Sequence, residues 1–134
     1  MRVAFAFFAE AVSISEVDRV DVRGAGADTI WAARFPTPAV QLPLVCRIEA
    51  SPRECEVPHE LRFELIDADG YVVCQSWQMT WRPERRAAEP YRVVHVTIVP
   101  PLGAIRFPAP GDYSLHILAD NHELAVVPLY VRAA

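Results

Sequence analysis

Two His-Glu pairs begin like the zinc-protease motif H-E-x-x-H, in which two histidines on one helix face hold a zinc ion. The pairs are His59-Glu60 and His122-Glu123. The second histidine of the motif would stand at positions 63 and 126, which hold phenylalanine and valine. Neither pair therefore predicts a zinc site.

Two other sets of side chains have the chemistry to hold a metal ion. His95 and His116 lie on expected strands and would form a metal pair if those strands adjoined, whereas solvent exposure or a hydrogen bond to a neighbour is the alternative. Asp67, Asp69 and Asp120 lie in expected turns and have calcium-binding chemistry, but the ligand spacing of an EF-hand is missing. Aspartates also favour plain turns without any ion. We expect no metal and no cofactor.

Nucleophilic catalysis has no complete motif in this chain. None of the serines lies in G-x-S-x-G. Cys55 is the best thiol candidate because it lies in a polar segment near His59. The flanking carboxylates Glu54 and Glu56 would raise its pKa and keep it protonated. We therefore expect no activated thiolate.

Two further absences narrow the chemistry. All 13 basic residues are arginine, so the chain contains no Schiff-base lysine and no phosphate-loop lysine. Gly24-x-Gly26 resembles the start of a dinucleotide-binding turn, but Thr29 stands at the third glycine position and no helix is expected to follow. The two glycines therefore predict a bulge or turn between strands.

The strongest candidate for a binding surface joins two tryptophans to a run of arginines. Its residues are Trp77, Trp81, Arg82, Arg85 and Arg86. Trp and Arg are enriched at interface hot spots, so the pattern predicts a patch for a protein or an anionic ligand. One alternative is core tryptophans followed by a solvated loop. Another is a stacking surface for single-stranded nucleic acid.

These side chains must be positioned by a domain of ordinary size. The 134 residues are 52% hydrophobic and 22% charged, which suits one core and a single domain over 1–134. The net charge of -4 disfavours nucleic acid and anionic membranes as partners. Three cysteines without a C-x-x-C pair indicate a reducing compartment. The apolar run 3–9 could imitate a signal peptide, but Glu10 interrupts it. We therefore expect a first strand there and a cytoplasmic protein.

Prolines scattered along the chain separate short segments rich in β-branched and aromatic residues. This pattern predicts an all-β fold, an antiparallel β-sandwich that is immunoglobulin-like or related, with about 8 to 9 short strands. Apolar and polar residues alternate in 42–50, 61–65, 91–99 and 113–117, and 124–132 is expected to return as the final strand. Cys46 falls on the apolar face of its strand. Helical turns are plausible only near 10–16 and 84–88.

Three local features refine this expectation. Asp67-Ala68-Asp69-Gly70 and Asp120-Asn121 are expected hairpin turns. Pro128 has no N–H to donate, so the last strand is expected at a sheet edge or bulged. For the segment 71–81 the pattern does not decide which side chains face the core, because Gln75 interrupts the apolar odd positions.

Several segments together resemble a family of small bacterial proteins known only as a domain of unknown function. They are Phe5-Ala6-Phe7-Phe8-Ala9, Gly24-Ala25-Gly26-Ala27-Asp28-Thr29-Ile30-Trp31, Asp67-Ala68-Asp69-Gly70, Phe107-Pro108 with Gly111-Asp112-Tyr113, and Pro128-Leu129-Tyr130-Val131. The glycine-rich stretch leading into Asp28-Thr29-Ile30-Trp31 is the most specific. The resemblance implies an all-β architecture and supplies no activity, cofactor or catalytic residue.

Three functions are compatible with the sequence. The first is a noncatalytic interaction or assembly module that binds a protein partner or self-associates through an edge strand. The second is a small-ligand or carbohydrate-binding module that uses exposed aromatic residues. The third is an enzyme with a site built from loops. The missing catalytic motifs favour the first.

Overall fold

The regular secondary structure of the chain is almost entirely β-strand, which confirms the all-β prediction. The computed structural model describes residues 1–16, 18–74 and 76–134. The strands are β1 (Arg2–Phe8), β2 (Ala11–Glu16), β3 (Arg19–Arg23), β4 (Thr29–Ala32), β5 (Leu44–Ala50), β6 (His59–Ile66), β7 (Trp77–Trp81), β8 (Val94–Ile98), β9 (Gly111–Ala119) and β10 (His122–Ala133). A 3-10 turn, η1, covers Pro52–Glu54. Within the described residues no helix is long and apolar enough to cross a membrane.

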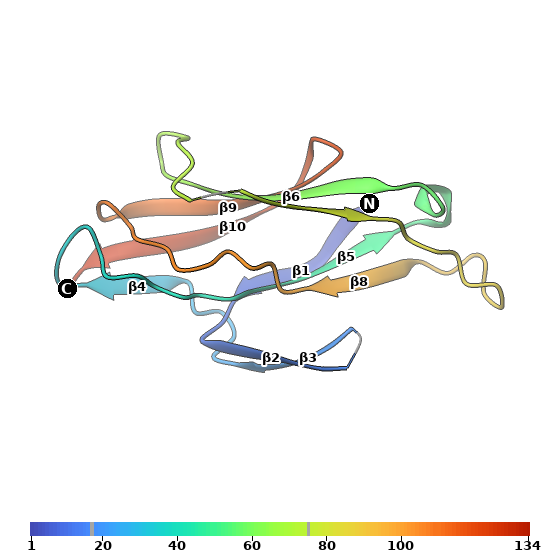
Figure 1. Cartoon of the computed structure of the whole chain (residues 1–134), viewed down its shortest axis with the longest axis horizontal. Coiled ribbons are helices and arrows are strands. Elements are labelled where there is room, and N and C mark those ends of the chain that lie inside the picture. Colours follow the sequence, from blue (N-terminus) through green and yellow to red (C-terminus); the bar gives the residue numbers. More distant parts are fainter. Residues whose placement is uncertain (17, 75) are drawn as a thin grey trace.

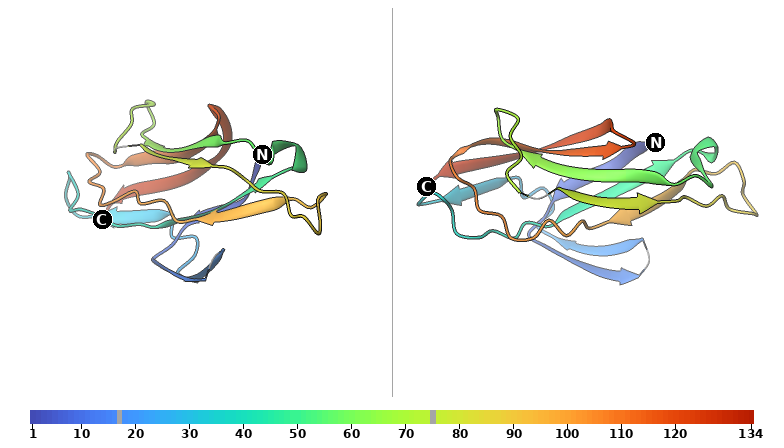
Figure 2. Two further views of the ribbon diagram at one scale, coloured as in Figure 1. Left: turned by 45° about the vertical axis from the view of Figure 1, so that its right-hand side comes forward. Right: turned by 45° about the horizontal axis from the view of Figure 1, so that its top comes forward.

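The strands form three sheets. A five-stranded sheet has the order β4-β10-β9-β6-β7, a three-stranded sheet has the order β1-β5-β8, and β2 pairs with β3 alone. In Figure 1 the five-stranded sheet curls, so that β4 lies level with the three-stranded sheet while β9 and β6 lie above it. The β2–β3 hairpin lies below the three-stranded sheet, and Figure 2 shows the same separation from two other sides.

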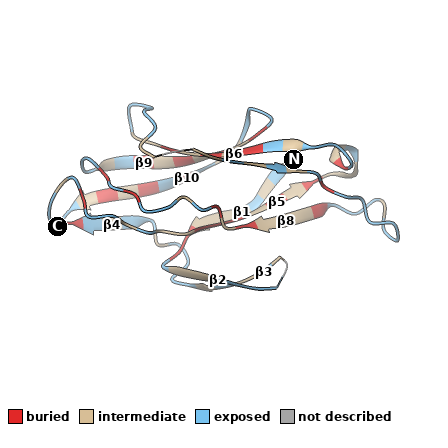
Figure 3. Cartoon of the chain, in the orientation of Figure 1, coloured by how far each residue is buried: buried red, intermediate tan, exposed pale blue. Residues whose placement is uncertain are grey.

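The core forms because alternate side chains of the longer strands are apolar and turn to the same side. The residues of β5, β6 and β9 that point into this core include Leu44, Cys46, Ile48, Leu61, Phe63, Leu65, Tyr113, Leu115 and Ile117. They belong to one cluster together with Val127, Leu129 and Val131 of β10. Figure 3 shows this alternation as red bands along the strands. The predicted inner faces of these strands, and the core position of Cys46, are confirmed.

The expectation of a helical turn near 10–16 was wrong. These residues form β2, which pairs with β3 in the register Val12↔Val22 and Ile14↔Val20. Valine and isoleucine at alternate positions favour a strand, and the pairing with β3 supplies the ladder that one strand lacks. No helix forms at 84–88 either, where Arg86 and Glu89 make an isolated β-bridge.

After the turn at Asp67–Gly70, the segment 71–81 is regular only over β7. The turn itself is confirmed: Gly70 has φ +87°, and the Asp67 carboxylate accepts hydrogen bonds from the amides of Asp69 and Tyr71, both at 2.9 Å. On β7 the odd positions face the core, where Trp77 packs against the main cluster. Gln75, the residue that left the inward side of this segment undecided, lies outside the described residues.

The prediction that the last strand lies at a sheet edge or is bulged at Pro128 was wrong. β10 lies between β4 and β9, Pro128 pairs with Ser114, and the register shift of β10 falls between Glu123 and Ala125. Pairing with β4 begins only at Tyr130, whose amide donates to the Asp28 carbonyl at 2.7 Å. Alternate residues of a strand point their backbone groups to the same side, so the Pro128 nitrogen also faces the β4 side. It lies beyond the last pair of that ladder, where its missing N–H costs no hydrogen bond.

The sheet is also not entirely antiparallel, which corrects the predicted topology. β4 and β10 run parallel, with Tyr130 opposite Thr29 and Arg132 opposite Trp31. A parallel pair needs a long connection, and the chain between these two strands contains most of the domain. No local pattern in either strand specifies the direction of its distant neighbour.

The β2–β3 hairpin is held against the three-stranded sheet by Asp18. Its carboxylate accepts a hydrogen bond from the Thr97 amide of β8 at 2.8 Å, and its carbonyl accepts one from the Arg47 guanidinium at 3.2 Å. Val45, on the hairpin side of β5, is fully buried. The hairpin therefore shields part of this sheet and engages the outer edge of β8.

Candidate functional site

The outward side of the five-stranded sheet carries a series of charged, hydroxyl and aromatic side chains. We call it the outer face. Its residues alternate along each strand with the buried ones, because successive side chains of a strand point to opposite faces of the sheet. They are Thr29, Trp31, Glu60, Arg62, Glu64, Ile66, Gln78, Thr80, Asp112, Ser114, His116, Leu118, Val126, Pro128, Tyr130 and Arg132.

One end of the outer face presents an exposed tryptophan. Trp31 is 67% exposed on β4 and lies opposite Arg132 in the parallel ladder. The Arg132 guanidinium carbon lies 5.3 Å from the centre of the Tyr130 ring, and the arginine pairs with Asp112 at 2.6 Å. We call Trp31, Tyr130, Arg132 and Asp112 the Trp31 platform. Sequence reasoning assigned no binding role to these residues, although two of the segments that carry the family resemblance pair here.

The middle of the outer face holds a serine, a histidine and a glutamate in hydrogen-bonding contact. The Ser114 hydroxyl lies 3.0 Å from Nε2 of His116, and Nδ1 of His116 contacts the Glu123 carboxylate. This order matches the nucleophile, base and orienting acid of hydrolases. Hydrolysis also needs donors for the oxyanion, but β9 uses its backbone amides in ladders with β6 and β10. The three residues therefore form a surface hydrogen-bond chain.

The structure separates the predicted Trp and Arg patch into two parts. The Trp77 ring lies 5.5 Å from the Phe63 ring, and Trp81 also packs against the core. Arg82, Arg85 and Arg86 are all exposed beyond the end of β7. Because the half-buried rings face the core while the arginines face solvent, the geometry favours a packing role for the tryptophans. A binding role for the set of five stays a prediction.

These arginines also have local partners. Arg85 donates to the Pro52 carbonyl at 2.7 Å, and Arg82 and Arg86 approach Glu84 and Glu89 at 3.7 and 3.6 Å. Arg86 and Trp81 line a small cavity of about 170 Å³ that also contains Asp18 and Glu84. Charges of both signs line it, so it is not built for an anion alone.

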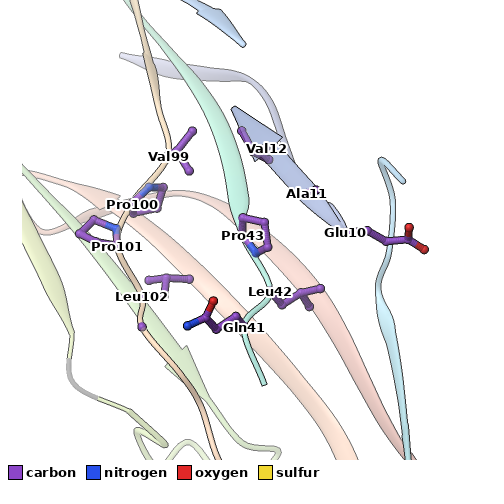
Figure 4. Close-up of a pocket in the computed structure, with 11 residues that line it drawn as sticks. Glu10, Ala11, Val12, Gln41, Leu42, Pro43, Val99, Pro100, Pro101 and Leu102 are labelled. Atoms are coloured by element: carbon purple, nitrogen blue, oxygen red, sulfur yellow. The ribbon is translucent and has the colours of Figure 1, made fainter. Parts of the chain in front are cut away.

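A larger groove lies between the hairpin and the three-stranded sheet. It has a volume of about 600 Å³ and is lined by Glu10, Ala11, Val12, Gln41, Leu42, Pro43, Val99, Pro100, Pro101, Leu102 and Gly103. Figure 4 shows Val12, Val99, Leu42 and Leu102 around its opening, with the Glu10 carboxylate pointing away. The groove is open and has few polar groups.

The glycine turn that precedes β4 is confirmed and has a steric cause. Gly24 has φ +66°, and a β-carbon there would lie 2.5 Å from Cγ of Glu10. The amide of Gly26 donates to the Phe8 carbonyl at 2.8 Å. The glycines therefore permit close approach between the end of β1 and the start of β4, where the amides of Gly26 and Ala27 donate to the Phe8 carbonyl.

The metal-binding alternatives are not assembled. His95 is on β8 and His116 on β9, which belong to different sheets. Asp120 binds the ring of His59 at 2.6 Å, and Asp67 holds its own turn. Among the residues that the structure describes, no three His, Cys, Asp or Glu side chains gather around a common point.

The thiol of Cys55 is buried, which agrees with the expectation that it stays protonated. Burial is the main cause that raises its pKa, followed by the charge of Glu56, while Arg85 opposes both. The sequence indicated the effect of the carboxylates. Burial of Cys55 beside Ala50 and Val94 depends on tertiary packing.

His59 makes two hydrogen bonds that together favour its charged form. Nδ1 lies 2.6 Å from the Asp120 carboxylate and Nε2 lies 2.8 Å from the Glu54 carbonyl. Both partners are acceptors, so both ring nitrogens must donate, which only the imidazolium does. Burial of the ring opposes protonation, but these bonds outweigh it and raise the pKa of His59. The hydrogen bond from His59 lowers the pKa of Asp120.

We expect His59→Gln to destabilise the protein by about 0.5–1 kcal/mol in mildly acidic solution and by less in alkaline solution. The raised pKa of His59 gives stability that is full below 6.5 and is lost as pH rises through the folded value. The lowered pKa of Asp120 gives stability that is present above 3.8 and is lost in acid. Urea unfolding at several pH values measures the difference, and a gap independent of pH would contradict the ion pair.

The fold and the site define a β-sheet domain with a polar and aromatic sheet face. The sequence model of a family of unknown function, DUF6941, matches residues 4–132. The chain therefore belongs to this family, as the resemblance in its sequence indicated. The search of curated proteins finds no match.

One solved structure is similar at the level of overall shape. It is the alkylpurine DNA glycosylase AlkC of Pseudomonas fluorescens bound to DNA containing an abasic site analog, with a TM-score of 0.46 and 13% sequence identity. The similarity covers 79% of this chain and 28% of the glycosylase. At that TM-score the similarity supports no argument about function.

Proposed function

We propose that this protein is a noncatalytic assembly module that pairs with a second copy of itself through the edge of β4. The observation that carries this proposal is the backbone of β4. Among the described residues β10 is its one neighbour in the sheet, and the amides and carbonyls of Thr29 and Trp31 point away from β10. The side chain of Trp31 stands on the outer face and leaves this backbone edge accessible. Edge strands with unpaired backbone groups are templates for pairing with another chain.

The direction of the β4 backbone groups follows from its ladder. The carbonyls of Asp28 and Ala32 accept hydrogen bonds from Tyr130 and Ala134 at 2.7 and 2.8 Å. Residues 28, 30 and 32 therefore face β10, and Thr29 and Trp31 direct their amides and carbonyls the other way. Within the described part of the chain, no backbone hydrogen bond outside the strand ladders uses either residue.

At the edges formed by β8 and β1 a backbone group is already hydrogen-bonded, and the edge formed by β7 has no tryptophan turned to the outer face. The Asp18 carboxylate occupies the outer amide of Thr97 on β8. The amides of Gly26 and Ala27 occupy the carbonyl of Phe8 at the end of β1. The tryptophans of β7 turn toward the core, whereas Trp31 does not.

Two copies can pair about a two-fold axis at Ile30. Thr29 of one copy then lies opposite Trp31 of the other, and both residues exchange their amide and carbonyl bonds as in an antiparallel hydrogen-bonded pair. The segment Thr29–Ala32 contains no charged side chain, so no like charges meet across the axis. The five-stranded sheets of the two copies would form one continuous sheet.

Thr29→Pro tests the proposed pairing. The substitution removes one outward amide and leaves the bonds of residues 28, 30 and 32 to β10 in place. We expect the wild-type protein to have about twice the 15.0 kDa mass of one chain in light scattering, and Thr29→Pro to have the mass of one chain. Size-exclusion chromatography with light scattering over the micromolar range measures both.

Thr29→Val is the matched control, because it keeps the amide and a β-branched side chain, and it is expected to remain dimeric. A wild-type protein that is monomeric across this range would contradict the proposal. A Thr29→Pro variant that remains dimeric would place the interface elsewhere.

We further infer that the two larger sheets form the layers of an immunoglobulin-like sandwich. Support comes from the core cluster, which contains residues of β5 and β8 as well as of β6, β9 and β10. A cytoplasmic location is supported by the three cysteines, Cys46, Cys55 and Cys74, which are all unpaired thiols. The acidic net charge supports partners other than nucleic acid or anionic membranes.

A further inference from the structure

We propose that the Trp31 platform binds a neutral sugar ring, which stacks on Trp31 and is held by Asp112 and Arg132 through its hydroxyl groups. This site uses the side chains of the outer face and does not require the backbone pairing of β4. Its support comes from exposure, from fixed geometry and from charge.

Exposure distinguishes Trp31 from the other two tryptophans. Trp31 is 67% exposed, whereas Trp77 and Trp81 pack against the core. An indole offers a flat apolar surface with a rigid shape. The C–H groups on one face of a pyranose ring form a matching apolar surface. A stacked sugar would cover the indole and leave its own hydroxyl groups at the rim.

The polar partners beside the indole are held in place before any ligand arrives. Neighbouring strands are about 4.8 Å apart, so the paired residues Trp31 and Arg132 have adjacent side chains. Arg132 donates to the Gly111 and Val131 carbonyls at 3.1 and 3.2 Å and to Oδ1 of Asp112 at 2.6 Å. Its guanidinium also lies over the Tyr130 ring. An arginine fixed in this way loses little conformational entropy on binding.

Asp112 and Arg132 each keep an atom that can hydrogen-bond to a sugar hydroxyl group. Within the described residues, Oδ2 of Asp112 and Nε of Arg132 make no hydrogen bond. The side chains of Asp112 and Arg132 are 68% and 40% exposed. A carboxylate accepts from one hydroxyl while a guanidinium donates to another, so adjacent hydroxyls of one ring match the pair.

The charges favour a neutral ligand. Arg132 and Asp112 neutralise each other, and Asp28 adds a carboxylate next to the platform. A nucleic acid or a phosphorylated ligand would bring its phosphates toward these carboxylates without an unpaired cation to meet them. Free carboxylates and phosphates are disfavoured for the same reason. A polyhydroxylated neutral ring satisfies the hydrogen bonds and the aromatic surface together.

The test follows the indole N–H signals of the three tryptophans by NMR in the full chain. The Trp31 signal is assigned by its loss in Trp31→Phe. Cellohexaose, chitohexaose and laminarihexaose are titrated separately, with the oligonucleotide (dT)8 as the comparison. We expect at least one sugar to shift the Trp31 signal saturably while the Trp77 and Trp81 signals stay in place.

Two variants separate binding from folding. Asp112→Asn removes the charged anchor of Arg132 and is expected to weaken the sugar Kd about tenfold. Glu60→Gln is the matched control, since Glu60 is a carboxylate at the far end of the outer face, bonded to Thr80, and it should leave Kd unchanged. The proposal is overturned if no sugar shifts Trp31 up to about 10 mM. It is also overturned if (dT)8 shifts Trp31, or if Asp112→Asn binds like the wild-type protein.

Discussion

Phe63→Ala is expected to lower the free energy of unfolding by about 3–5 kcal/mol. Phe63 is 1% exposed on β6, an interior strand of the five-stranded sheet that pairs with both β7 and β9. Removing the ring leaves a cavity among strands that are fixed by ladders on both sides, so collapse around it is limited. Urea unfolding followed by far-ultraviolet circular dichroism measures the change.

The three tryptophans provide the controls for this result. Trp77→Ala should cost about 2–3 kcal/mol, because this ring packs on Phe63 but is only half-buried. Trp31→Ala should cost less than about 0.5 kcal/mol, because surface residues contribute little to folding. Equal losses at Trp31 and Trp77 would contradict the assignment of Trp77 to the core and Trp31 to the outer face.

Stability at alkaline pH is expected to depend on Cys46. Burial raises the pKa of this thiol from 9.0 to about 12, so the folded state keeps a proton that the unfolded state loses. Because the folded state binds more protons above pH 9.0, stability falls as pH rises through this range. The contribution of Cys46 is about 1.4 kcal/mol per pH unit, until the folded thiol also ionises.

Cys46→Val removes the titrating group and keeps an apolar side chain of similar size. Urea unfolding of the two proteins between pH 8 and about pH 11 should show equal stability trends below the ordinary thiol pKa and a widening gap above it. The other two thiols and the tyrosines are present in both proteins and cancel in the difference. A gap that stays constant with pH would show that Cys46 is not buried as a thiol.

The inner faces of the longer strands could be predicted from local pattern. Leu61, Phe63 and Leu65 are buried while Arg62 and Glu64 are not, because side chains alternate along a strand and one side faces the core. The turns at Gly70 and Asn121 follow the same logic, since both residues adopt positive φ. These features depend on residues within a few positions of each other.

The candidate site could not be predicted in this way. Trp31 and Arg132 are a hundred positions apart, and only the parallel pairing of β4 with β10 makes them neighbours. Ser114 and His116 share a strand, but their contact with Glu123 needs the turn into β10. The structure places Trp77 and Arg85 apart, because the Trp77 ring packs on Phe63 while Arg85, beyond the end of β7, donates to the Pro52 carbonyl.

The sequence by itself determined the all-β class, the buried faces of the main strands, the turns and the membership in DUF6941. Tertiary structure alone decided which tryptophan is exposed, where the hairpin β2–β3 packs, and that Pro128 lies in an interior strand. The physical reason is how far apart in the sequence the residues that determine each feature lie. Alternation and turn chemistry are encoded by neighbouring residues, whereas strand order and direction depend on which distant segments bury their apolar sides against one another.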